Sequence, residues 1–189
     1  MINKLSEKTN KILNDFAESQ LNNTSGFMTE YDSMSLEDCV DRNQLSYKPG
    51  FSEEYFIDTF KLSMITESLT EQYAEAFRLG ADLYNADWLR TYINGFWVPD
   101  ELGHADPHKK ILMNFGYTEH ELDLMLKEAD EQTSYKENHE AGLMPVQLTT
   151  FGLFQECITD YWYELQASLF PTGSNANGKR LSEAKIKGI

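Results

Sequence analysis

Apolar and polar residues recur with helical periodicity over most of the chain, and no stretch alternates like a β-strand. Five segments have this periodicity: about residues 2–20, 52–79, 81 or 87–104, 118–133 and 145–170. The pattern predicts an all-α protein, in which long amphipathic helices pack as a bundle.

Capping and turn residues mark the predicted helix ends. Ser52, followed by two glutamates, predicts an N-cap with acids in the first turn. Gly80 predicts the end of this helix at about residue 79. The segment Thr118–Glu121 has the pattern of a capping box, which predicts another helix start. Proline has no backbone N–H, so Pro99 should kink or break its helix, and Pro107 should end or bend it again.

The same pattern divides the chain into three parts. Residues 1–50 are predicted to form an N-terminal helix and an irregular arm, with a short helical turn near residues 35–40. Residues 51–170 are predicted to form the helical core. Residues 171–189 are predicted to be a linker and the start of a further helix.

Composition restricts the class of protein. The 189 residues are 41% apolar and 25% charged, which is typical of one folded domain with a core. The net charge of −15 disfavours nucleic acid and anionic membrane surfaces as partners. No apolar run reaches the roughly 18 residues of a membrane span, and residues 1–8 lack the apolar core of a signal peptide. Free thiols at Cys39 and Cys157 in a reducing cytoplasm are therefore expected.

The chain contains one Glu-x-x-His pair, Glu101 and His104. On a helix this spacing places a carboxylate and an imidazole on one face. Di-iron carboxylate proteins build their metal centres from such pairs, together with single glutamates from other helices. One pair alone is weak evidence, so the residues at fixed distances from it decide its meaning.

Glu156 is a candidate partner on the helix predicted at 145–170. Its own column holds small and polar residues and one tyrosine: Thr149, Gly152, Thr159 and Tyr163. A separate apolar stripe consists of Phe151, Phe154, Ile158, Trp162, Leu165 and Leu169. The two together predict a buried helix, in which a carboxylate is paired or binds metal. The alternative is that Glu156 meets an arginine or lies at a surface edge.

Three glutamates, Glu67, Glu71 and Glu75, follow one another one helical turn apart. Such a column is usually a solvated acidic face. Apolar residues precede it on the same side of the helix, which favours an inward position for one acid: Ile57, Phe60 and Met64. The choice between Glu67 and Glu71 stays open. The remaining histidines are predicted to lie at the surface: His108, His120 and His139.

Three motifs in this order resemble the soluble acyl-ACP desaturases. The segment 97–106, with Trp97, Asp100, Glu101, His104 and Asp106, resembles the family's W-x-x-E-E-x-x-H-x-D. Residues 69–71, Leu-Thr-Glu, resemble its L-T-E segment, and residues 154–159, Phe-Gln-Glu-Cys-Ile-Thr, its F-Q-E-x-x-T segment. The resemblance covers roughly residues 55–170.

The resemblance implies a ferritin-like bundle that uses two irons and O₂ to desaturate an acyl chain. Glu71 would be a terminal ligand of one iron, Glu101 would bridge the irons, and His104 would bind the first. Glu156 would be a terminal ligand of the second iron. Thr159 would match a threonine that the family associates with oxygen activation or proton delivery. Carboxylates and imidazole suit iron.

The resemblance also implies partners: acyl carrier protein holding the substrate, a ferredoxin-type electron donor and a second copy in a homodimer. Carrier protein is acidic, so binding to a chain of charge −15 would require local basic clusters. One candidate cluster is Arg90, Lys109 and Lys110; the other is Lys179, Arg180, Lys185 and Lys187.

The chain departs from the family pattern at several places. Val98-Pro99 stands where the family has Thr-Ala, Gly103 stands where an arginine is usual, and residues 160–163 replace its Ser-His-x-Asn. The family's fourth metal-binding helix would fall just past Ile189. We therefore expect the N-terminal part of a desaturase-like enzyme with little activity alone, or a protein that lost half its site. The alternatives are another di-iron oxygenase, such as an arylamine N-oxygenase-like enzyme, and a metal-free helical interaction protein.

Overall fold

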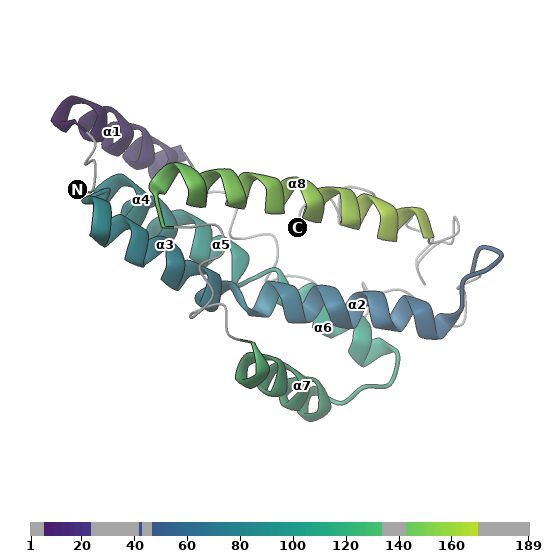
Figure 1. The fold of residues 1–189 in the computed structure, drawn as a ribbon. Helices are drawn as coiled ribbons and strands as arrows, with labels where there is room; N and C mark the ends of the chain where they lie inside the picture. The colour runs from purple at the N-terminus through teal and green to yellow at the C-terminus, as the bar shows by residue number, and fades with distance from the viewer. Residues whose placement is uncertain (1–5, 24–41, 43–46, 134–142, 170–189) are drawn as a thin grey trace.

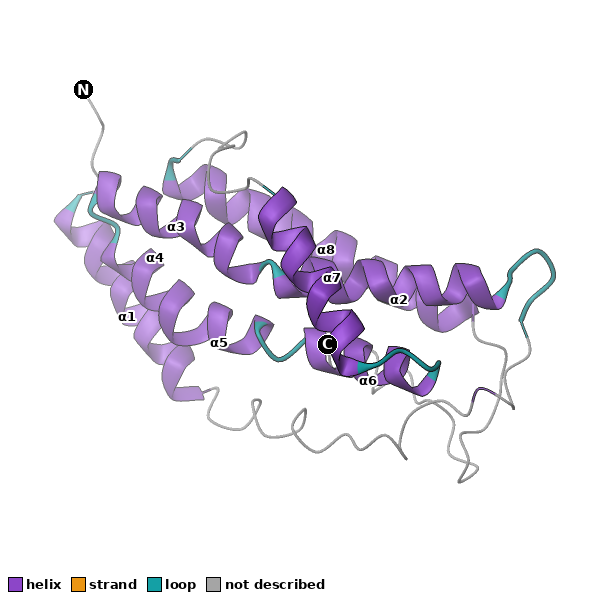
Figure 2. Ribbon diagram, turned by 90° about the horizontal axis from the view of Figure 1, so that it is seen from below, coloured by secondary structure: helices purple, strands orange, loops and turns teal. Residues whose placement is uncertain are grey.

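The computed structural model describes residues 6–23, 42, 47–133 and 143–169. Within them the chain forms helices joined by turns, with no strand, which confirms the all-α class (Figures 1 and 2). The long helix α8 runs along one side of the bundle and α7 lies on the other (Figure 1). No helix in these ranges combines the length and the apolar character needed to cross a membrane.

The N-terminal helix α1 spans Glu7–Asn23 and packs against α4, Asp87–Tyr92. It confirms the helix predicted at the start of the chain. Most of the predicted irregular arm, including the turn expected at residues 35–40, lies outside the described residues. The same holds for residues 171–189.

The helix predicted over residues 52–79 is two helices, α2 (Glu53–Ser68) and α3 (Thr70–Tyr84). Ser52 caps α2 as predicted, because its Oγ accepts a hydrogen bond of 3.1 Å from the Tyr55 N–H. The break comes at Leu69, and the predicted stop at Gly80 is wrong. Gly80 lies inside α3, where a Cβ atom would stand only 2.4 Å from Leu148 Cδ1 on α8.

Pro99 disturbs its helix without ending it. The π-helical segment η4, Ile93–Trp97, joins α4 to α5, Val98–Glu101. The Val98 N–H bonds to the Ile93 carbonyl, five residues back, which widens this turn. Proline cannot donate to the preceding turn, so the predicted disruption takes this form immediately before Pro99.

A helix not separately predicted, α6, spans Ala105–Asn114. Pro107 lies in its first turn, where a missing N–H costs nothing, so the prediction that it ends or bends a helix is wrong. Helix α7, Glu119–Gln132, begins with the predicted capping box: Thr118 Oγ1 accepts from the Glu121 N–H, and Glu121 Oε2 accepts from the Thr118 N–H.

Helix α8, Pro145–Leu169, has the predicted extent but presents the opposite side to the bundle. Its buried residues lie in or beside the column of Glu156: Leu148, Tyr163 and Gln166. The predicted apolar stripe is exposed over most of its described length, with Phe154 at 63% and Ile158 at 68%. The expectation of a helix buried on most sides is therefore wrong, because α2 and α3 cover only one face of α8.

Two apolar clusters form the core. One, between α2, α6 and α7, contains Phe56, Phe60, Met64, Ile111, Leu112, Phe115 and Leu122. The other joins α3, α4, η4 and α5 to α8 and contains Ala74, Phe77, Ala81, Ala86, Leu89, Ile93, Val98 and Leu148. Glu67 follows Met64 by one turn and Glu101 follows Val98, so the candidate site lies where the two clusters meet.

Candidate metal centre

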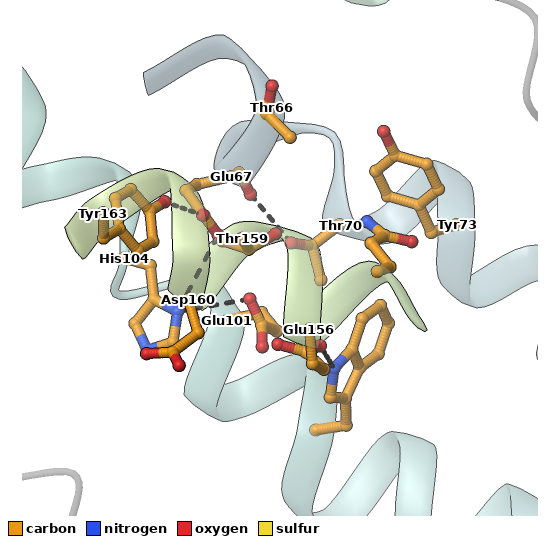
Figure 3. Close-up of a pocket in the computed structure, with 12 residues that line it drawn as sticks. Thr66, Glu67, Thr70, Tyr73, Glu101, His104, Glu156, Thr159, Asp160 and Tyr163 are labelled. Carbon is orange, nitrogen blue, oxygen red and sulfur yellow. Dashed lines mark hydrogen bonds and ion pairs between the residues drawn. The ribbon is translucent and has the colours of Figure 1, made fainter. Parts of the chain in front are cut away.

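Glu67, Glu101 and His104 form a compact buried group (Figure 3). One potential ligand atom from each side chain lies within 4.8 Å of the other two. Glu67 comes from the last turn of α2, Glu101 ends α5, and His104 stands in the turn before α6. Among the described residues, this is the group whose donors are close enough to share a metal ion.

The Glu-x-x-His pair keeps its helical geometry although α5 ends at Glu101. Leu102 and His104 both have right-handed helical backbone angles, so the chain continues to turn as a helix would. Glu101 and His104 therefore face the same side, and His104 Nδ1 lies 3.2 Å from Glu101 Oε2. The same nitrogen lies 3.7 Å from Glu67 Oε2, which brings α2 to the pair.

Glu156 and Thr159 lie beside this group without belonging to it. Both line a cavity of about 190 Å³ that also borders the three buried residues (Figure 3). Glu156 accepts a hydrogen bond of 3.0 Å from Trp97 Nε1. The other residues of the cavity wall are mostly polar: Thr66, Thr70, Tyr73, Gln155, Asp160 and Tyr163.

The charges of the group depend strongly on one another. Burial raises the pKa of Glu101 to about 7, and the charges of Glu156 and Glu67 add to this rise. Burial alone would lower the pKa of His104, but the hydrogen bond to Glu101 and the ion pair with Glu67 outweigh it and raise that pKa to about 10. Burial would raise the pKa of Glu67, yet the ion pair with His104 and the hydrogen bond from Tyr163 bring it below the usual value. A charged imidazole thus lies between carboxylates.

His108 is fully buried, so its predicted surface position is wrong. Its ring lies between Phe60, at 5.6 Å between ring centres, and Tyr163, at 5.4 Å. Neither ring nitrogen has a hydrogen-bond partner among the described residues, and burial lowers the pKa to about 4. A signal was present in the sequence: Ile111, Leu112 and Phe115 share its face of the helix, and all are buried.

Glu71 lies outside the group. It is exposed in the first turn of α3 and pairs with Arg78 at 2.6 Å. Glu67, the alternative one turn earlier, occupies the position expected of Glu71. The signal was the spacing of Phe60, Met64 and Glu67, which places the acid on the buried face of α2. Glu101 and His104 lie together as predicted, and Glu156 lines the same cavity from an exposed position on α8.

The donor set suits a divalent first-row metal ion. Two carboxylates and one imidazole are ligands that iron, manganese and zinc accept. Four acids line the cavity: Glu67 and Glu101 are buried, whereas Glu156 and Asp160 are exposed. The two buried carboxylates favour a cation between them, because like charges at close range repel one another. In the described residues, His104 supplies the cation nearest to Glu67 and Glu101.

Comparison of the chain with protein-family models, with curated proteins and with solved structures gives no match. The residues of the site and their contacts therefore carry the indication of function.

Proposed function

We propose that the protein binds iron at Glu67, Glu101 and His104 and is an O₂-dependent oxidoreductase. The observation that carries this proposal is the burial of two carboxylates and an imidazole whose donor atoms approach within 4.8 Å. Burying such groups is costly unless a partner compensates for the lost water. A divalent cation supplies more of that compensation than the single positive charge of His104.

The finer form of the proposal is a di-iron centre of the acyl-ACP desaturase type. Glu156, on α8, would bind the second ion, and Glu101 would be shared between the two. Glu67 takes the role that the resemblance gives to Glu71. Iron, when bound, supplies the activation of O₂. The support is the shared cavity, which Glu156 lines together with Glu67, Glu101 and His104.

Thr159 is the proposed proton-delivery residue. It lies one helical turn after Glu156 and is half-buried in the wall of the same cavity. The cavity volume of about 190 Å³ accommodates ions, water and O₂. Pockets for larger ligands usually enclose about 300–1,000 Å³. An acyl chain would therefore enter only if lining side chains moved, and the acyl substrate is proposed on the resemblance alone.

Of the two basic clusters proposed to dock carrier protein, the structure describes one: Arg90, Lys109 and Lys110. Arg90 forms an ion pair with Asp82, and Lys109 pairs with Glu119 and Asp123. These acids offset much of the positive charge that an acidic carrier would need. The second cluster, residues 179–187, lies outside the described residues. Carrier protein, electron donor and homodimer all stay predictions.

Metal titration tests the proposal. Anaerobic addition of Fe²⁺ or Co²⁺, followed by absorption and calorimetry, should show binding of at least one ion per chain. Glu101→Gln should weaken it, because one charged donor is lost, whereas Glu54→Gln, at an exposed position in α2, should not. Loaded protein should then consume O₂, and acyl thioesters of carrier protein should be tried as substrates.

The opposite result is also informative. If the wild-type chain binds neither ion at micromolar concentration, the site needs no metal, and the ion pairs of His104 alone compensate the buried carboxylates. The metal-free interaction protein then becomes the better explanation. Metal binding with O₂ consumption but without a double bond in the acyl product would favour another di-iron oxygenase.

A further inference from the structure

Tyr163 connects α8 to the candidate metal centre. It is almost fully buried, at 3% exposure, and its hydroxyl donates a hydrogen bond to Glu67 Oε1 (Figure 3). The two residues are 96 positions apart in the sequence. A hydrogen bond to an ionised carboxylate is among the stronger ones in proteins, so this contact can fix the orientation of Glu67.

The two oxygens of Glu67 have different partners. Oε1 accepts from Tyr163, whereas Oε2 lies 3.7 Å from His104 Nδ1. Oε2 therefore faces the other members of the group, and Oε1 is turned towards α8.

The phenol ring is itself held in place. It stacks on His108 with 5.4 Å between ring centres and 24° between planes. Gln166, one turn further along α8, donates to the Thr59 carbonyl and to Ser63 Oγ on α2. These contacts anchor α8 to α2 beside Tyr163, so the hydroxyl is presented to Glu67 by a rigid support.

We propose that Tyr163 is a positioning residue that makes Glu67 a single-oxygen metal ligand. The hydroxyl occupies Oε1 and leaves Oε2 for the ion. Groups that hydrogen-bond to metal ligands orient them, and their loss typically weakens metal binding by about 10- to 100-fold. This inference rests on the proposed metal site and adds a function for Tyr163 that the sequence motifs did not assign.

Tyr163→Phe tests it, because the variant keeps the stacked ring and removes only the hydroxyl. We expect Co²⁺ to bind about 10- to 100-fold more weakly than to wild type. The infrared spectrum of the Co²⁺-bound protein should also change, because the separation of the two carboxylate stretching bands distinguishes one-oxygen from two-oxygen binding. Tyr161→Phe is the matched control: this residue of α8 is 68% exposed, and neither measurement should change.

A double-mutant cycle shows whether the effect passes through Glu67. In a Glu67→Gln background, adding Tyr163→Phe should weaken Co²⁺ binding little further. Circular dichroism establishes that each variant folds. Should Tyr163→Phe not fold, fluorotyrosine at position 163 retains ring and hydroxyl but alters hydrogen-bond strength, and it should shift the carboxylate bands of the Co²⁺-bound protein.

The possible failures are distinct. Absence of Co²⁺ binding by wild-type protein would overturn the proposed function together with this inference. Wild-type binding with unchanged affinity and unchanged carboxylate bands in Tyr163→Phe would overturn the role of Tyr163 alone. An equal loss of affinity in the presence and absence of Glu67 would show that Tyr163 acts on the site by another route.

Discussion

Glu67 Oε2 lies 3.7 Å from His104 Nδ1, and this contact joins the last turn of α2 to the turn that precedes α6. His104 is also 3.2 Å from Glu101, so one imidazole holds acids from two separate helices. The first consequence concerns which glutamate of the Glu67, Glu71, Glu75 column binds metal.

Glu67→Gln should weaken binding of Fe²⁺ or Co²⁺ by more than about tenfold. Loss of a group that only hydrogen-bonds to a metal ligand already costs about that much, and loss of a charged ligand should cost at least as much. Glu71→Gln should leave it unchanged, since Glu71 pairs with Arg78 on the surface. Calorimetric titration of both variants checks this. A loss in Glu71→Gln, with normal binding in Glu67→Gln, would reverse the assignment of the ligand.

The metal-free protein should lose stability as the pH rises above 7. The pKa of His104 is about 10 in the folded state against 6.5 for an unperturbed histidine, so its bound proton stabilises the folded state fully below pH 6.5. That contribution disappears as the pH rises through about 10. Glu101, with a pKa raised to about 7, acts in the same sense between pH 4.5 and 7. Urea unfolding at several pH values should show this slope, and His104→Gln should flatten it.

His108 should affect stability in the opposite sense to His104: it should destabilise the folded protein as the pH falls. Its pKa of about 4 means that acid favours the unfolded state, which takes up a proton from about pH 6.5 downward. His108→Phe removes this effect and two unpartnered nitrogens while preserving the aromatic packing. The gain in unfolding free energy should therefore be larger at pH 5 than at pH 8, with a limit on the order of 3 kcal/mol at low pH.

His120→Gln is the control for that experiment, because His120 is exposed at the start of α7. It should leave the pH dependence of unfolding as in wild type. A gain for His108→Phe of the same size at pH 5 and pH 8 would show that His108 is not held neutral by burial.

Gly80→Ala should destabilise the contact between α3 and α8. A Cβ atom at this position would lie 2.4 Å from Leu148 Cδ1 and 2.6 Å from the Leu143 carbonyl oxygen, and the latter belongs to the backbone. Overpacking of this kind typically costs about 1–3 kcal/mol. Thermal unfolding should show a lower midpoint. Gly103→Ala, whose Cβ would meet Asp100 O at 3.5 Å, should unfold at or above the wild-type temperature.

Local sequence determined the helices and the pair at the centre of the site. The hydrogen bonds of Ser52 and Thr118 at helix starts involve residues three positions away, so a short window of sequence is enough to predict them. The same holds for Glu101 and His104, whose spacing keeps them on one face even where the helix ends. Such relationships depend on backbone geometry that neighbouring residues share.

Tertiary packing decided which faces of those helices are buried. The break at Leu69 and the approach of His104 select Glu67 over Glu71, although the two are one turn apart. Likewise α8 carries both an apolar stripe and the column of Glu156, and the side that packs on α2 and α3 is the column side, where Leu148, Tyr163 and Gln166 are buried. The hydrogen bond between Tyr163 and Glu67 follows from that choice. Helical periodicity shows which residues share a face, but only the positions of the other helices determine which face is covered.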